Sequence, residues 1–211
     1  MTPRNTERLA VDGPAGAIEV VLNVPAPVLR GIALVCHPHP LQGGTLDNKV
    51  VQTLAKAFFG LGYAAARFNF RGVGQSEGAF DDGIGETDDA LAVLAAVRSR
   101  VGESLPIALA GFSFGSFVQT RVAARIDAER LVLVAAAVKR FPVEQVAADT
   151  IVVHGEEDDV VPLADVLDWA RPQQLPIVVF PGCGHFFHGR LPQLSRIVTT
   201  MWPKGGAGAQ P

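Results

Sequence analysis

Short apolar segments of strand length alternate with longer segments of helical periodicity along almost the entire chain. The strand-like segments are residues 17–24, 32–37, 63–70, 107–112, 131–137, 151–155 and 177–180. Helical patterns cover residues 49–62, 85–102, 114–126, 163–170 and 190–201. This alternation predicts an α/β fold, in which a mostly parallel sheet of about seven or eight strands carries helices on both faces. In such a sheet, ligands bind at the edge formed by the carboxyl ends of the strands.

The bulk properties of the chain indicate one compact unit. Its 211 residues contain no internal repeat and no linker, so we predict a single domain over residues 1–204 and a flexible tail at 205–211. The formal net charge is −3 and no basic cluster stands out, which argues against binding to nucleic acid or to an anionic membrane surface. The sequence carries no signal for a particular oligomeric state.

The lack of a visible targeting signal and the cysteine content suggest in which compartment the protein works. The first residues lack the apolar core of a secretory signal, and no stretch approaches 18 uninterrupted apolar residues. The two cysteines, Cys36 and Cys183, cannot form a disulfide framework, and we expect both to be buried as small apolar residues. A cytoplasmic protein without a membrane span is therefore predicted.

A serine stands between two glycines directly after the strand predicted at 107–112. The pattern Gly111-Phe112-Ser113-Phe114-Gly115 is G-x-S-x-G. A nucleophilic serine on a sharp turn from strand to helix needs glycine at these positions, because other side chains would collide there. The alternative is that Ser113 only caps the following helix, but a cap does not require the flanking glycines. We therefore predict that Ser113 is a nucleophile.

A serine nucleophile needs a base, and the base needs a carboxylate to orient it. The chain has histidines at positions 37, 39, 154, 185 and 188. On a sheet of this kind the chain order is serine, acid, histidine, so only His185 and His188 qualify. We predict His185 as the base because it follows a strand end and a glycine, whereas His188 lies nearer the next helix. The acid belongs to the run Glu156, Glu157, Asp158 and Asp159, and spacing alone leaves all four open.

The stretch "CHPHP" raises the question of a metal site. His37 and His39 are separated by one proline, and a tetrahedral site would need further ligands nearby. Only Cys36 is available, and strand alternation points it away from His37. We therefore predict no metal site.

The same stretch follows a strand end where a backbone amide can stabilise an oxyanion. One donor is expected at Phe114, directly after the nucleophile, and the second in the loop after the strand at 32–37. Pro38 and Pro40 have no N–H group, which leaves the amide of His39, with Leu41 as the next candidate.

Five segments together resemble a known family. They are "HPHPLQGGTLDNKVV", "RFNFRGVGQSEG", "GFSFG", "HGEEDDVVP" and "GCGHFF". The chain resembles, over about residues 10–200, the small α/β-hydrolases without a lid, which are related to dienelactone-hydrolase-like and serine-aminopeptidase-like proteins. The resemblance implies the α/β-hydrolase fold, supports His185 and His39, and points to Asp158 as the acid, with Asp159 second. Dienelactone hydrolases use a cysteine nucleophile, so Ser113 favours a serine esterase instead.

The expected activity is hydrolysis of small or medium carboxylic esters through an acyl-enzyme, without a cofactor. Residues 138–149 are too few for a lid, so an open site is expected. For its pocket we predict Leu41, Phe186, Phe187 and Arg71, although Arg71 also fits a role as a loop anchor. A thioesterase or an aminopeptidase would use the same triad. A ligand-binding module on a hydrolase fold is the alternative that is not an enzyme.

Overall fold

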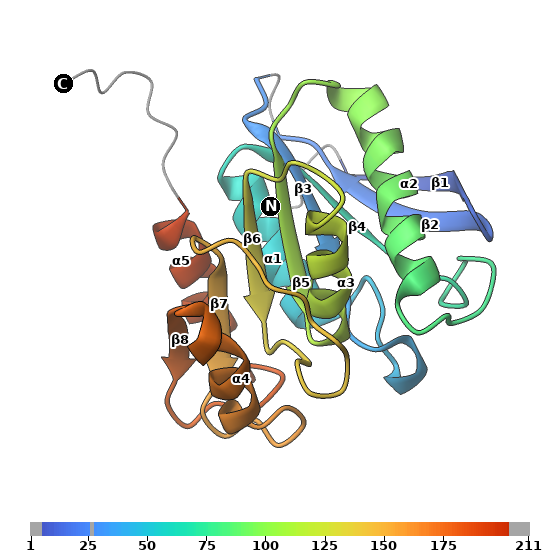
Figure 1. Cartoon of the computed structure of the whole chain (residues 1–211). Helices are drawn as coiled ribbons and strands as arrows, with labels where there is room; N and C mark the ends of the chain where they lie inside the picture. Colours follow the sequence, from blue (N-terminus) through green and yellow to red (C-terminus); the bar gives the residue numbers. More distant parts are fainter. Residues whose placement is uncertain (1–5, 26–27, 203–211) are drawn as a thin grey trace.

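The computed structural model describes residues 6–25 and 28–202, which contain one eight-stranded sheet with helices on both faces (Figure 1). The strands are β1 (Thr6–Gly13), β2 (Gly16–Asn23), β3 (Gly31–Cys36), β4 (Tyr63–Phe68), β5 (Ile107–Phe112), β6 (Arg130–Val134), β7 (Ile151–Gly155) and β8 (Ile177–Phe180). The helices are α1 (Lys49–Gly60), α2 (Ile84–Val101), α3 (Phe114–Ala123), α4 (Leu163–Ala170) and α5 (Leu191–Met201), with 3₁₀ turns η1 (Pro40–Gln42) and η2 (Arg171–Gln173). The predicted α/β-hydrolase fold is confirmed. The tail predicted at 205–211 lies outside the described residues.

The order of the strands determines where a ligand can bind. It is β1-β2-β4-β3-β5-β6-β7-β8, and β1, β2 and β4 pair antiparallel while all other neighbours pair parallel. From β3, the chain first adds β4 on one side and then β5 and its successors on the other. A crevice therefore opens outside the carboxyl ends of β3 and β5, where the connections diverge.

Two apolar cores hold the helices against the sheet. Helices α2 and α3 cover one face, with Val93 and Val118 in its core, while α1 and α5 cover the other, with Leu54 and Leu194 in its core (Figure 1). The buried strands β3 and β5 are almost purely apolar because both of their faces are covered. These central strands give the loops that follow them a rigid base.

The ends of the helices follow from local polar contacts. Asn48 accepts hydrogen bonds from the amides of Val50 and Val51 and so starts α1. The buried carboxylate of Glu86 accepts from the amides of Asp81 and Gly83 at the start of α2.

Several element boundaries differ from the predicted ones. Strand β1 was not predicted; it pairs with β2 in an antiparallel hairpin at the edge of the sheet. Strand β6 ends at Val134 rather than at 137, because Ala135 has φ 47° and leaves the extended conformation. Helix α3 ends at Ala123 rather than 126, and β4 ends at Phe68 rather than 70.

The connection between β6 and β7 carries no lid. Residues 135–150 form only turns and irregular backbone, so the prediction that this segment is too short for a lid is confirmed. Among the described helices, none has both the length and the apolar character needed to cross a bilayer.

Candidate active site

Ser113 occupies a sharp turn between β5 and α3. Its φ is 55° and its ψ is −117°, values that cost a residue with a side chain conformational energy. The Ser113 amide donates to the Val134 carbonyl at 2.9 Å, which anchors the turn on β6. Its hydroxyl makes no capping hydrogen bond to α3, although the residue stands at the capping position. The interpretation of Ser113 as a simple helix cap is therefore wrong.

The two glycines of the G-x-S-x-G pattern are required by close packing. A Cβ atom on Gly111 would lie 2.3 Å from the carbonyl oxygen of Gly115. A Cβ atom on Gly115 would lie 2.4 Å from the carbonyl oxygen of Cys36. Real Cβ atoms do not approach backbone so closely, so both positions exclude a side chain. The turn consequently sits directly against the end of β3.

Asp158 and His185 form a buried pair at the same edge of the sheet. The Nδ1 atom of His185 lies 2.7 Å from Oδ2 of Asp158. The imidazole ring also packs on Phe112, the residue before Ser113, with ring centroids 5.0 Å apart. Among the four acids from 156 to 159, only Asp158 is buried. His188, the other histidine considered for the base, is exposed.

Hydrogen bonds fix the charge of Asp158. Its Oδ1 atom accepts from the amides of Val160 at 3.0 Å and Val161 at 2.7 Å. Burial alone would raise the pKa of Asp158, but the hydrogen bonds from His185 and the Val161 amide outweigh burial and lower this pKa. The carboxylate is therefore ionised at neutral pH.

The loops that carry Asp158 and His185 are joined to each other by their backbones. The Glu157 amide donates to the Cys183 carbonyl at 2.9 Å, and the Glu156 amide donates to the Phe180 carbonyl at 3.0 Å. A Cβ atom on Gly155 would lie 2.3 Å from the Cys183 carbonyl oxygen. This packing holds two loops from distant parts of the sequence in one position.

The histidine-rich stretch after β3 is a structural device. The His37 Nδ1–H group donates to the Pro38 carbonyl at 2.6 Å, and Nε2 accepts from the Phe70 amide at 2.9 Å. Both ring nitrogens are thus used within the protein and neither is free to bind a metal. Cys36 and Cys183 are buried free thiols. Burial raises the pKa of both thiols, which keeps them protonated at neutral pH.

His39 and Phe114 come after the carboxyl ends of β3 and β5, which are parallel neighbours in the sheet. The two side-chain rings are 5.1 Å apart between centroids, so the η1 loop touches the start of α3. Neither amide has a hydrogen-bond acceptor within residues 6–25 or 28–202. The Leu41 amide, in contrast, donates to Nδ1 of His39 at 3.2 Å. Leu41 is thereby less available as a donor than His39.

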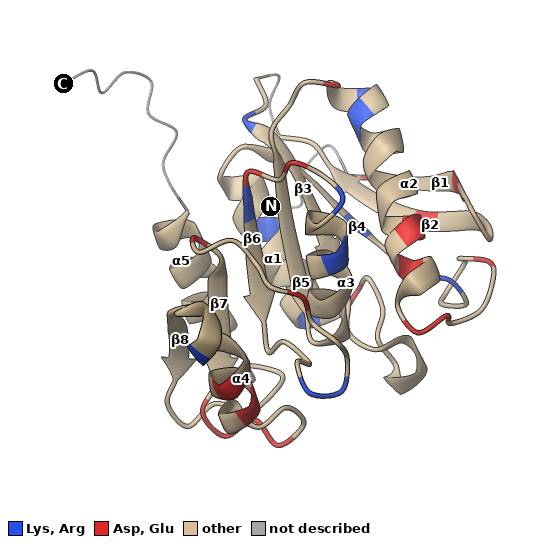
Figure 2. Ribbon diagram, in the orientation of Figure 1, with Lys and Arg blue, Asp and Glu red and all other residues tan. Residues whose placement is uncertain are grey.

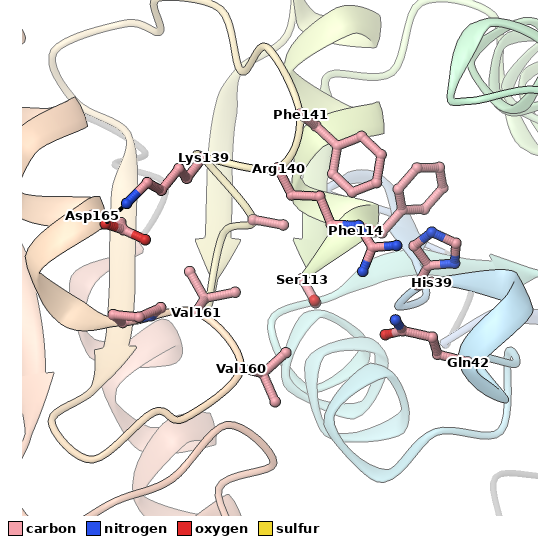
Figure 3. Close-up of a pocket in the computed structure, with 12 residues that line it drawn as sticks. His39, Gln42, Ser113, Phe114, Lys139, Arg140, Phe141, Val160, Val161 and Asp165 are labelled. Carbon is pink, nitrogen blue, oxygen red and sulfur yellow. Dashed lines mark hydrogen bonds and ion pairs between the residues drawn. The ribbon is translucent and has the colours of Figure 1, made fainter.

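A cavity of about 240 Å³ opens beside Ser113 (Figure 3). Its apolar walls and polar side chains come from the η1 loop, the turn at Ser113, the β6–β7 connection and the start of α4. The lining residues are His39, Gln42, Ser113, Phe114, Ala137, Lys139, Arg140, Phe141, Val160, Val161, Pro162 and Asp165. Ala137, Lys139, Arg140 and Phe141 could not be found from the sequence, because the irregular connection at 135–150 carries no periodic pattern.

None of the four residues predicted to line a pocket lines this cavity. Phe187 has φ 53° and is fully buried against Phe180. Arg71 binds both carboxylate oxygens of Asp89 at 2.8 Å, so it is the loop anchor that the sequence also allowed. Leu41 is exposed to solvent, and the ring of Phe186 contacts the ring of His185 edge-on, with centroids 5.0 Å apart.

Comparison with known proteins identifies the family. Residues 39–148 match the family model described as serine aminopeptidase, S33. An uncharacterized protein of Rickettsia prowazekii is 32% identical over 201 residues, which cover 89% of this chain and 84% of that protein.

Solved structures give the same picture. A serine hydrolase without a lid from Xanthomonas campestris is similar with a TM-score of 0.89 and 35% identity, covering 100% of this chain and 99% of that one. An α/β serine hydrolase homologue from Coxiella burnetii has a TM-score of 0.86 and 40% identity, with coverage of 93% and 97%. The chain therefore belongs to the α/β-hydrolase superfamily, among its serine hydrolases without a lid.

Proposed function

We propose that this protein is a carboxylic-ester hydrolase that uses Ser113 as nucleophile, His185 as base and Asp158 as the orienting acid. The observation that carries the proposal is the buried hydrogen bond between Asp158 and His185 beside a serine whose hydroxyl caps nothing. Asp158 engages Nδ1 of the imidazole, which leaves Nε2 to act on the serine.

The reaction would proceed in two steps. The Ser113 hydroxyl attacks the ester carbonyl carbon while Nε2 of His185 takes its proton. The tetrahedral intermediate then breaks its bond to the alcohol oxygen, which receives that proton and leaves. Water, activated by His185, releases the acid from the acyl-enzyme. No cofactor takes part.

The amides of Phe114 and His39 would stabilise the negative oxygen of both intermediates. Both residues line the cavity, and neither amide donates to another group among the described residues. A donor of this kind is worth about 2.7–4 kcal/mol in the transition state. Pro38 and Pro40 restrict the backbone on both sides of His39, so the donor is in place before substrate arrives.

An aminopeptidase is the second candidate, because the matching family model carries that description. A small, open cavity without a lid suits small or medium acyl groups better than a long peptide. We also propose a cytosolic location, since thiols such as the buried Cys36 and Cys183 persist in a reducing compartment.

A fluorophosphonate probe tests the proposed function. We expect covalent labelling of Ser113 in the native protein and in Ser99→Ala, an exposed control, and none in Ser113→Ala. Hydrolysis of p-nitrophenyl butyrate should fall by about 10⁶-fold in Ser113→Ala. Absence of labelling in the native protein would contradict the proposal and favour the alternative of a ligand-binding module on a hydrolase fold. Activity lost to a chelator and restored by zinc would point to a metal hydrolase.

A further inference from the structure

The cavity beside Ser113 contains one cation, Arg140, that forms no ion pair with a carboxylate of the described residues. Two of the charged side chains in it, Lys139 and Asp165, form an ion pair of 3.1 Å. Arg140, from the same connection, has no ion pair or hydrogen bond with any described residue, and its guanidinium only stacks on Phe141 at 5.7 Å from the ring centroid. In Figure 2 the connection after β6 contains a basic segment, drawn in blue.

The guanidinium of Arg140 extends toward Ser113 and His39, although the residue as a whole is exposed. In Figure 3 it extends from the β6–β7 connection into the space between Ser113, His39 and Gln42. The proximity of this charge also helps burial to lower the pKa of His39. An unpaired cation that reaches into a cavity is available to a ligand.

Two further side chains of the cavity, His39 and Gln42, can donate hydrogen bonds. Nδ1 of His39 accepts from the Leu41 amide at 3.2 Å, so the neutral ring carries its proton on Nε2. The amide of Gln42 points toward Ser113 from the opposite side (Figure 3). Since Lys139 already engages Asp165, no free acid competes for these donors within the cavity lining.

We infer that Arg140 makes this enzyme selective for esters that carry a second, free carboxylate on the part of the substrate that fills the cavity. Guanidinium binds carboxylate through two parallel hydrogen bonds, which fixes orientation as well as charge. The apolar walls, among them Phe141 and Val160, would accommodate a short carbon chain between the reacting carbonyl and the anion. The same cation disfavours the ammonium group of an aminopeptidase substrate. The inference rests on the proposed esterase function.

Matched substrate pairs test this selectivity at both ends of the ester. The first pair is the p-nitrophenyl half-ester of adipic acid and its analogue with a terminal carboxamide. The second pair is the butyrate esters of 4-hydroxybenzoate and 4-hydroxybenzamide. In one pair at least, we expect the native enzyme to favour the carboxylate by about tenfold in kcat/KM, mainly through KM. Arg140→Gln should abolish the preference, so that the carboxylate and the carboxamide of each pair are hydrolysed with equal kcat/KM.

The control variant is Arg171→Gln, which removes an exposed arginine paired with Asp168 outside the cavity. It should retain the preference. Equal rates within both pairs in the native enzyme, or a preference that survives Arg140→Gln, would overturn the inference while the esterase proposal stands.

If none of the four esters is hydrolysed, a binding measurement separates the proposed anion recognition by Arg140 from the proposed esterase activity. Calorimetric titration of Ser113→Ala with methyl hydrogen adipate needs no turnover. Binding that weakens about tenfold in Ser113→Ala/Arg140→Gln would support anion recognition even where the esterase proposal fails. The inference about Arg140 would be rejected if Ser113→Ala did not bind the compound, or if both variants bound it with the same affinity.

Discussion

Nδ1 of His185 lies 2.7 Å from Oδ2 of Asp158, and both side chains are almost completely buried. The second carboxylate oxygen is held by the amides of Val160 and Val161. Every direction in which the carboxylate could rotate is therefore opposed by a hydrogen bond. An acid fixed in this way also fixes the tautomer of the imidazole that it binds.

Replacement of Asp158 by asparagine should reduce kcat by about 10⁴-fold, because the amide preserves the shape of the pair but no longer selects the productive tautomer. Steady-state kinetics with p-nitrophenyl butyrate measures the loss. Asp159→Asn is the matched control, since Asp159 is its exposed neighbour and should keep native kcat. The assignment of the acid is wrong if Asp159→Asn, and not Asp158→Asn, loses activity.

His37 should make the protein less stable in mild acid. Burial lowers the pKa of His37 to about 3, whereas an unfolded histidine titrates near 6.5. Between these values the unfolded chain binds the additional proton, so the free energy of unfolding falls as the pH drops from 6.5 toward 3. Urea unfolding at pH 7 and pH 5 should differ by about 2 kcal/mol from this group alone.

The variant His37→Gln isolates that contribution. It should be less stable than the native protein at pH 7 but lose less stability on going to pH 5. Burial also lowers the pKa values of His39 and His154, so part of the acid sensitivity should remain. An unchanged difference between the two pH values in His37→Gln would contradict the prediction, whereas exposed His188→Gln should keep the native difference.

Gly115→Ala should destabilise the protein by about 3 kcal/mol, because its Cβ atom would press on the Cys36 carbonyl and force β3 and α3 apart. Gly60→Ala provides the opposite case. Gly60 ends α1 with no heavy atom within 4 Å of an added Cβ, so alanine should stabilise by about 0.4–1 kcal/mol. Thermal and urea unfolding of the two variants should therefore shift in opposite directions, and equal shifts would refute the packing argument.

Loss of Asp89 should affect stability rather than substrate recognition. The Asp89 side chain is 1% exposed and that of Arg71 is 11% exposed, so Asp89→Ala leaves a nearly buried guanidinium without its main partner. A cost of about 3–5 kcal/mol is expected. Asp88→Ala, which breaks the exposed pair with Arg125, should cost less than about 1 kcal/mol. The fraction of Asp89→Ala that remains folded should have the native KM. A raised KM would instead support the prediction that Arg71 lines the substrate pocket.

Much of the fold could be predicted because buried strands and amphipathic helices have distinct periods. Strand β1 escaped prediction since only Leu9 and Val11 mark its inner face, and one face of an edge strand is all that is covered. Alternation through these two residues, followed by the turn at Gly13–Gly16, was the available signal.

The side chains at the strand ends were easier to predict than those of the cavity. Ser113 follows β5 directly and His185 lies in the loop after β8, so parallel topology alone brings their segments to one edge. Spacing could not distinguish Asp158 from Asp159, because the choice depends on which carboxylate the Val161 amide meets. The positions of the Arg140 and Phe187 side chains depend on the path of irregular backbone. Periodic sequence patterns do not predict that path.

The connection between β6 and β7 contributes to the cavity wall but supplies none of the proposed catalytic residues. The proposed catalytic residues follow the ends of strands, whereas Lys139, Arg140 and Phe141 belong to a segment with no helix or strand. Substitutions within residues 138–141 should thus alter which molecules the proposed esterase accepts without disturbing the sheet. For protein engineering, this short loop is the segment to exchange when a different substrate is wanted, because the strands behind it need no change.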